Sequence, residues 1–119
     1  MDSATNFVNL DFLDSFTKGD TEKRNQYIQL YLKTAPQLFA DLQSLYDREL
    51  WDDLYVKAHS LKPQVLYMGI SHLSVLLVKI EELAKLKGNR NELGTIVKQA
   101  IDGNDQAMNE LKQHIGVVR

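Results

Sequence analysis

Three side chains in this sequence have types and spacing suited to chemistry: His59, Lys62 and Glu81. Lys62 follows His59 by three residues, and side chains three apart are neighbours on a helix surface. A carboxylate that accepts a hydrogen bond from one imidazole nitrogen leaves the other nitrogen unprotonated and nucleophilic. A phosphoryl group formed on that nitrogen carries close to two negative charges, and the lysine places a cation beside it. The set therefore suits a histidine that carries a phosphoryl group.

The helix that must present His59 is predicted to start near Leu50 or Trp51 and to end near Met68. At about 100° per residue, its apolar side chains fall within one arc that faces the core. These are Trp51, Leu54, Ala58, Leu61, Val65 and Met68. His59 lies about 130° from the centre of that arc, so we expect it at the surface or at the boundary of the core.

A second helix must bring Glu81 to His59. Gly69 is predicted to be the C′ residue of the first helix, and Ser71 the N-cap of the next, which runs from His72 to about Lys87. Its core arc consists of Leu73, Leu76, Leu77, Ile80 and Ala84, with Glu81 on the flank. If the two helices fold back on each other about a turn near Ile70, Glu81 lies level with His59. We therefore expect a histidine and a carboxylate to meet at one edge of a helical hairpin.

Helical spacing of apolar residues continues through most of the remaining sequence. A short helix is predicted from Leu10 to Thr17. Thr21 is the expected N-cap of a long helix that continues to about Tyr46 and is kinked near Ala35, because Pro36 removes one backbone hydrogen bond.

The last predicted helix runs from about Glu92 to Ile115. Strand signals are absent, so the predicted fold is all-α. Four amphipathic helices with short links form an antiparallel (up-down-up-down) four-helix bundle, and the short extra N-terminal helix packs across one end. We expect residues 1–119 to form a single domain.

Composition excludes several classes of function. The 14 basic and 16 acidic residues give a net charge of −2, whereas a nucleic-acid-binding protein usually has a positive excess. The absence of cysteine excludes disulfides and thiolate metal sites. No apolar run approaches the roughly 20 residues that cross a bilayer. The N-terminus, MDSATNFVNLDF, does not resemble a secretory signal, so we expect a cytoplasmic protein with no membrane contact. Met1 favours a chain that stands alone.

A partner surface is predicted around His59. Tyr55 and Pro63 are one helical turn from it, and Leu66 and Val78 are apolar residues that point away from the core arcs. Exposed apolar side chains beside a reactive group are typical of a docking site. The full set of predicted partner-binding residues is Tyr55, Pro63, Leu66, Ser74, Val78 and Lys85.

The segment Ala58-His59-Ser60-Leu61-Lys62-Pro63, followed by Gly69 and Leu73, resembles the signature of histidine phosphotransfer (HPt) domains. That pattern is A-H-x-L-K-G, with a glycine ten residues after the histidine and a leucine four further on. The upstream run, with its short helix, Gly-Asp and a long helix with an internal proline, is also similar, and the resemblance covers roughly residues 8 to 115. Pro63 is the one departure from the motif. It stands where the family usually has glycine, and it removes the amide that would bond the His59 carbonyl.

This resemblance implies a phosphorelay intermediate. Nε2 of His59 would accept a phosphoryl group from a receiver aspartate or from a kinase and pass it to another receiver. Lys62 would balance the phosphoryl charge, and Glu81 would hold Nδ1. The chain would be a carrier and not an autonomous enzyme. It would need no cofactor of its own, because the receiver supplies Mg²⁺. The implied partners are response-regulator receiver domains and a hybrid histidine kinase, and we expect a monomer.

Two other interpretations remain open. The chain could be a non-catalytic interaction module that has the fold without relay activity, although the presence of both His59 and Lys62 argues against this. It could also be a helical metal protein that uses His59, His72 and Glu81, but no helix carries a Glu-x-x-His pair. His72 is expected to be a solvated residue in the first turn of its helix. His114 is expected in the last turn of the last helix, where a cation suits the dipole.

Overall fold

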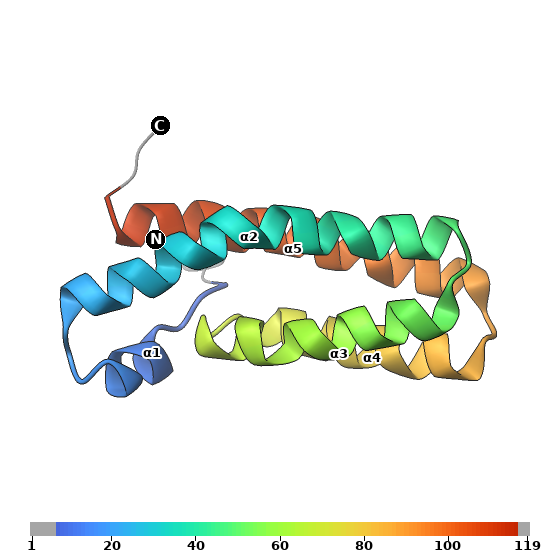
Figure 1. Cartoon of the computed structure of the whole chain (residues 1–119), viewed down its shortest axis with the longest axis horizontal. Coiled ribbons are helices and arrows are strands. Elements are labelled where there is room, and N and C mark those ends of the chain that lie inside the picture. The colour runs from blue at the N-terminus through green and yellow to red at the C-terminus, as the bar shows by residue number, and fades with distance from the viewer. Residues whose placement is uncertain (1–6, 117–119) are drawn as a thin grey trace.

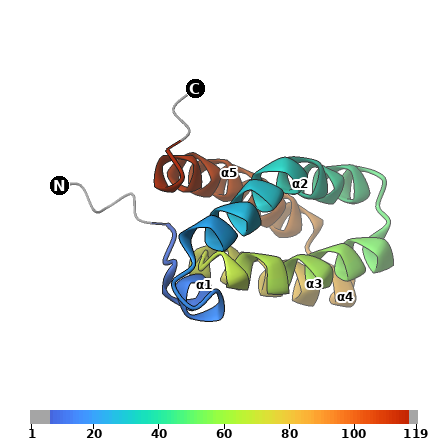
Figure 2. The ribbon, with the colours of Figure 1, turned by 60° about the vertical axis from the view of Figure 1, so that its left-hand side comes forward.

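The computed structural model describes residues 7–116, and within that range it contains helices and no strands. Four long helices run in alternating directions as an antiparallel bundle, and a short helix lies across one end (Figures 1 and 2). The helices are α1 (Asp11–Phe16), α2 (Thr21–Asp47), α3 (Trp51–Tyr67), α4 (Ser71–Leu86) and α5 (Arg90–His114). The predicted all-α bundle is confirmed. The ends of the predicted domain, residues 1–6 and 117–119, lie outside the described residues.

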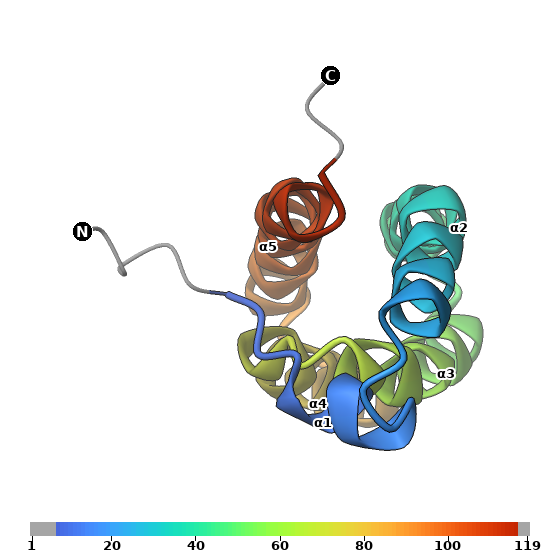
Figure 3. The ribbon, with the colours of Figure 1, turned by 90° about the vertical axis from the view of Figure 1, so that its left-hand side faces the viewer.

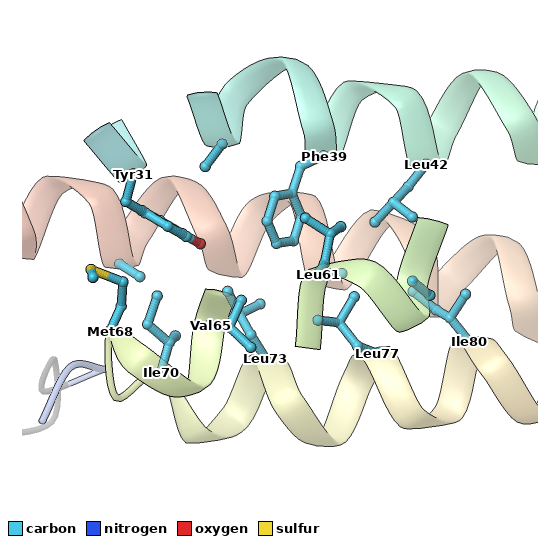
Figure 4. Close-up of a cluster of buried hydrophobic side chains, with 14 of the residues drawn as sticks. Tyr31, Phe39, Leu42, Leu61, Val65, Met68, Ile70, Leu73, Leu77 and Ile80 are labelled. Carbon is cyan, nitrogen blue, oxygen red and sulfur yellow. The ribbon is translucent and has the colours of Figure 1, made fainter. Parts of the chain in front are cut away.

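The core lies between the apolar faces of the four long helices. Figure 4 shows Phe39 and Leu42 of α2 packed toward Leu61 of α3 and Leu77 of α4. The arcs predicted for α3 and α4 are mostly correct. Trp51 and Leu76 are the exceptions, since they are only partly buried and pack against the edge of the core.

Helix α2 is continuous through Pro36, as predicted, and Pro36 itself is exposed. The kink expected near Ala35 stays a prediction. The N-cap of α2 is Asp20 and not Thr21. The Asp20 carboxylate accepts a hydrogen bond from the backbone N–H of Lys23 at 3.1 Å, so the aspartate takes the capping position one residue earlier.

Two other helix starts also differ from the prediction. Helix α4 begins at Ser71 itself, and its N-cap is Ile70, which has no side chain able to cap. Helix α5 begins at Arg90, two residues before the expected start at Glu92, because Asn89 caps it. The Asn89 side chain accepts from the Glu92 N–H at 3.2 Å and donates to the Glu92 carboxylate at 2.8 Å.

The turn between α3 and α4 depends on Gly69, which has the predicted C′ position and a φ of +67°. The N–H of Gly69 donates to Leu66 and that of Ile70 to Val65, which is the hydrogen-bond pattern of a Schellman motif. A Cβ on Gly69 would collide with the backbone of Asn9, whose N–H donates to the Gly69 carbonyl at 3.0 Å. This glycine therefore closes the hairpin and also lets the N-terminal segment cross it.

The N-terminal segment, residues 7–10, holds α1 against one end of the bundle (Figure 3). The backbone N–H groups of Phe7 and Val8 donate to the carboxylate of Glu110 on α5, at 2.7 and 3.3 Å. The Asn9 bond to Gly69 fixes the same segment to the α3–α4 turn. Together these contacts place α1 beside the C-terminal end of α3.

Candidate functional site

His59 lies on the exposed side of α3, and 64% of its side chain is accessible to solvent. The helix buries Ala58 and Leu61 on its opposite face, which fixes the outward direction of the histidine. Tyr55, one turn earlier, lies nearly parallel to the imidazole, with ring centroids 6.1 Å apart and 19° between the planes. The ring is thus supported on one side and remains accessible to a partner.

Glu81 contacts His59 from α4, as expected from the register of the hairpin. Its Oε2 lies 2.6 Å from Nδ1 of His59, and only 11% of its side chain is exposed. An ionised carboxylate can only accept hydrogen bonds, so the proton of this bond belongs to Nδ1. In the neutral form of the ring, Nε2 is then the unprotonated nitrogen, on the side that faces away from Glu81.

Lys62 also binds Glu81, a contact that the sequence reasoning missed. Its Nζ donates to Oε1 at 2.9 Å, so each oxygen of the carboxylate has one partner. Burial alone would raise the pKa of Glu81, but the hydrogen bonds from Lys62 and His59 outweigh it and hold this pKa below its usual value. The register of the hairpin could have predicted the contact between Lys62 and Glu81, because Val78 is level with Lys62 and Glu81 is one turn from Val78.

The six residues predicted to bind a partner lie on α3 and α4, around the His59–Glu81 contact. Leu66 is 61% exposed and Val78 is 40% exposed, so both apolar side chains reach the surface. Pro63 and Lys85 are also exposed, whereas Tyr55 and Ser74 are partly buried. The expected apolar surface beside His59 is present, and its role in docking stays a prediction.

An exposed aromatic cluster, formed by Phe12, Phe16, Tyr27 and Tyr67, was not predicted. The centroid of the Tyr67 ring is 5.4 Å from that of Phe12 and 5.5 Å from that of Phe16, which is 5.7 Å from that of Tyr27. A cavity of about 580 Å³ opens beside three of these rings. Tyr67 is about 12 Å along α3 from His59 at 1.5 Å per residue and is also exposed, so the cluster lies farther along the same helix. The spacing of Phe12 and Phe16, four residues apart, is the feature of the sequence that could have indicated this cluster.

The expectation that His72 is solvated is wrong. The histidine is in the first turn of α4, but the N-terminal segment covers it, and its ring centroid is 4.9 Å from that of Phe7. Its Nε2 is buried without a hydrogen-bond partner, close to the helix backbone at Gly103, and burial lowers the pKa of His72. His114 is in the last turn of α5, as predicted, with its Nε2 3.9 Å from Glu110.

Residues 7–116 contain no group of three or more histidine, aspartate or glutamate side chains that could hold a metal ion. His59 and Glu81 meet, but His72 packs against Phe7 instead of joining them. The metal-protein interpretation therefore has no support in the described part of the chain. No helix in the same range is long and apolar enough to span a membrane.

Comparison with protein-family models gives a match to the Hpt domain over residues 26–117. The chain belongs to the Hpt domain family. No curated protein and no solved structure matched it. The matched range contains His59, Lys62 and Glu81 together with most of the bundle, whereas α1 lies outside it.

Membership of the Hpt family assigns this chain to two-component signalling. Hpt domains are phosphocarriers that interact with receiver domains and kinases in phosphorelays. The bundle described above is a suitable scaffold for this role, because its rigid α3–α4 hairpin presents one accessible histidine beside a buried carboxylate.

Proposed function

We propose that this Hpt domain is a phosphorelay intermediate that carries a phosphoryl group on His59. It accepts the group from a receiver aspartate or a histidine kinase and passes it to another response-regulator receiver. The observation that carries the proposal is the 2.6 Å contact between Nδ1 of His59 and Oε2 of Glu81. This contact keeps the proton on Nδ1 and leaves the lone pair of the accessible Nε2 free to attack phosphorus.

The transfer step follows from this arrangement. The lone pair of Nε2 attacks the phosphorus of an aspartyl phosphate, the N–P bond forms, and the O–P bond of the donor breaks. The electron pair leaves with the aspartate carboxylate, and no proton has to move. Lys62 is about one helical turn from His59 and would contribute a positive charge near the phosphoryl oxygens. The reverse sequence returns the group to a second receiver.

In this proposal the chain acts as a carrier and not as an autonomous enzyme. It offers a nucleophile, a hydrogen-bond acceptor and one cation, whereas the aspartate that exchanges the group belongs to the receiver. Mg²⁺ would come from the receiver as well, so the chain needs no cofactor of its own. A cytoplasmic, monomeric protein without nucleic-acid partners stays our prediction.

The proposed docking surface surrounds His59 and extends to both sides of it. Leu66 and Val78 form its apolar part on the α3–α4 hairpin. The aromatic cluster extends it along α3 toward α1. A standard protein interface covers roughly 800 Å² on each partner, which is enough to reach from His59 to Tyr67.

Incubation with a phosphorylated receiver and Mg²⁺ tests the relay role. We expect the parent chain to acquire an acid-labile phosphate on His59 and to return it to a second receiver. His59→Gln should remain unlabelled, whereas His114→Gln, in the last turn of α5, should be labelled like the parent. Full labelling of His59→Gln would falsify the proposal. A parent chain that no receiver of its organism labels would favour the non-catalytic interaction module.

A further inference from the structure

The carboxylate of Glu81 is shared between two partners, and only Lys62 is charged when Nε2 of His59 is the free nucleophile. One oxygen accepts from Nδ1 of His59 at 2.6 Å and the other from the ammonium of Lys62 at 2.9 Å. The side chain of Glu81 is 11% exposed, whereas those of Lys62 and His59 are 32% and 64% exposed. A nearly buried carboxylate needs a compensating charge, and here Lys62 is that charge.

The partner of Lys62 in this structure and the proposed site of phosphorylation lie at different nitrogens of the imidazole. Lys62 is bonded to Glu81, which contacts the ring at Nδ1, while the phosphoryl group would form on Nε2. The lysine therefore cannot serve as the best partner of both anions in one position. Its flexible four-carbon stem can reach either, since the ammonium is a compact charge with rotatable donors.

Phosphorylation changes the charge of the ring. When the Nε2 lone pair forms the N–P bond and the donor oxygen leaves with its electron pair, Nδ1 keeps its proton. The imidazole is then a cation, hydrogen-bonded to Glu81, and carries an anionic phosphoryl group on its other nitrogen. Glu81 thereby gains a second positive neighbour at the moment when a new anion appears near Lys62.

We propose that phosphorylation of His59 transfers Lys62 from Glu81 to the phosphoryl group, while the cationic ring takes over as the charge partner of Glu81. This inference rests on the proposed function. In both states the buried carboxylate has one full positive charge beside it, so the exchange leaves no unpaired charge inside the bundle. Departure of the phosphoryl group reverses the exchange and returns Lys62 to Glu81.

Side-chain NMR of the lysine ammonium groups tests the exchange directly. The chain is phosphorylated with phosphoramidate, a small donor whose N–P bond breaks to release ammonia, so that no receiver is required. The comparison variant is Glu81→Gln, whose amide oxygen still accepts from Nδ1 but carries no charge to hold Lys62. In the unphosphorylated chain, we expect this substitution to move the Lys62 signal. In the phosphorylated chain, we expect Glu81→Gln to move the Lys62 signal at least threefold less than it does in the unphosphorylated chain.

Two controls accompany the measurement. Lys57 is bound to Asp41 at 3.3 Å, away from Glu81, and its signal should respond neither to phosphorylation nor to Glu81→Gln. His59→Gln treated with phosphoramidate reports any effect of labelling other histidines. The proposal is overturned if Glu81→Gln shifts Lys62 equally in both states, since Lys62 would then remain on Glu81 throughout.

Failure of the exchange and failure of the relay role give different results. If phosphoramidate labels His59 and Lys62 changes partner, but no phosphorylated receiver labels the chain, the exchange stands and the relay role falls. If receivers label His59 and Lys62 keeps its dependence on Glu81, the relay role stands and the exchange falls. A His59 that no donor labels overturns both.

Discussion

The imidazole of His59 and the carboxylate of Glu81 form a 2.6 Å contact between α3 and α4, with the histidine exposed and the glutamate nearly buried. The difference in burial gives each group a distinct role. The buried carboxylate fixes the orientation and the protonated nitrogen of the ring, and the exposed edge of the ring is left for a partner.

Substitution of Glu81 tests this division of roles. We expect Glu81→Ala to slow phosphorylation of His59, because the proton is then free to occupy either ring nitrogen. Glu81→Gln keeps an acceptor for Nδ1 and should retain more of the rate. Nitrogen NMR of the imidazole in the parent chain should show the proton on Nδ1. A parent ring protonated mainly on Nε2 would contradict the assignment.

Removal of Lys62 should destabilise the fold more than an ordinary surface substitution, because it takes one partner from a buried carboxylate. We expect Lys62→Ala to lower the free energy of unfolding by about 1 to 2 kcal/mol. The matched control is Lys57→Ala, which breaks a more exposed pair with Asp41 and should cost at most about 0.5 kcal/mol. Equal losses in urea unfolding of the two variants would show that Glu81 does not need Lys62.

The difference in free energy of unfolding between the parent chain and Lys62→Ala should depend on pH in a defined direction. The pKa of Glu81 is lower in the folded chain than the usual glutamate value of 4.5, because of its bonds to Lys62 and His59. The stabilisation is therefore complete above pH 4.5 and is lost as the pH falls through the folded-state pKa. We expect the gap between parent and Lys62→Ala to be present above pH 4.5 and to shrink below it. A gap that widens in acid would contradict this linkage.

The site could be found from the sequence because a regular hairpin relates its two halves. Gly69 marks the end of α3, and once the turn is fixed, constant helical rise places Glu81 level with His59. The same register also predicts that Lys62 can reach Glu81, because Glu81 is about one turn from the residue level with Lys62. Pairing only the residues that are directly level does not reveal this contact. Sequence reasoning thus succeeds where periodic elements determine the geometry.

The surroundings of His72 and of α1 could not be predicted from the sequence in the same way. Residues 7–10 have no helical period, and they are held by individual bonds from Phe7 and Val8 to Glu110 and from Asn9 to Gly69. These contacts join parts of the chain that are distant in sequence, so no local sequence pattern predicts them. They cover His72, which is partly buried, and bring the aromatic residues of α1 to the end of α3.

Pro63 should act as a small residue beside the reactive histidine. Pro63→Gly restores the residue usual in the family and should change the transfer rate by about tenfold at most, equal to ~1.4 kcal/mol of barrier. Pro63→Arg should keep the helical circular dichroism spectrum and block transfer from a receiver, since its side chain would overhang His59. Gln99→Arg, on the exposed face of α5, is the control for added charge. Unimpaired transfer in Pro63→Arg would mean that receivers do not dock over this turn.

The aromatic cluster gives the last prediction, because it decides how far the docking surface extends from His59. Phe12 is 48% exposed and packs against Tyr67 from α1, so a glutamate in its place adds a charge to the cluster without opening the core. We expect Phe12→Glu to weaken receiver binding about tenfold, which corresponds to ~1.4 kcal/mol. Gln99→Glu controls for the added negative charge on α5.

The same variant should accept phosphate from phosphoramidate at the parent rate, because Phe12 contacts neither His59 nor Glu81. This combination separates docking from chemistry, since a small donor needs no protein surface. Loss of both reactions would indicate that α1 supports the fold of the site and not its interface. Receiver affinity equal to that of the parent would confine the docking surface to the α3–α4 hairpin, and the exposed rings of α1 would then have no part in the relay.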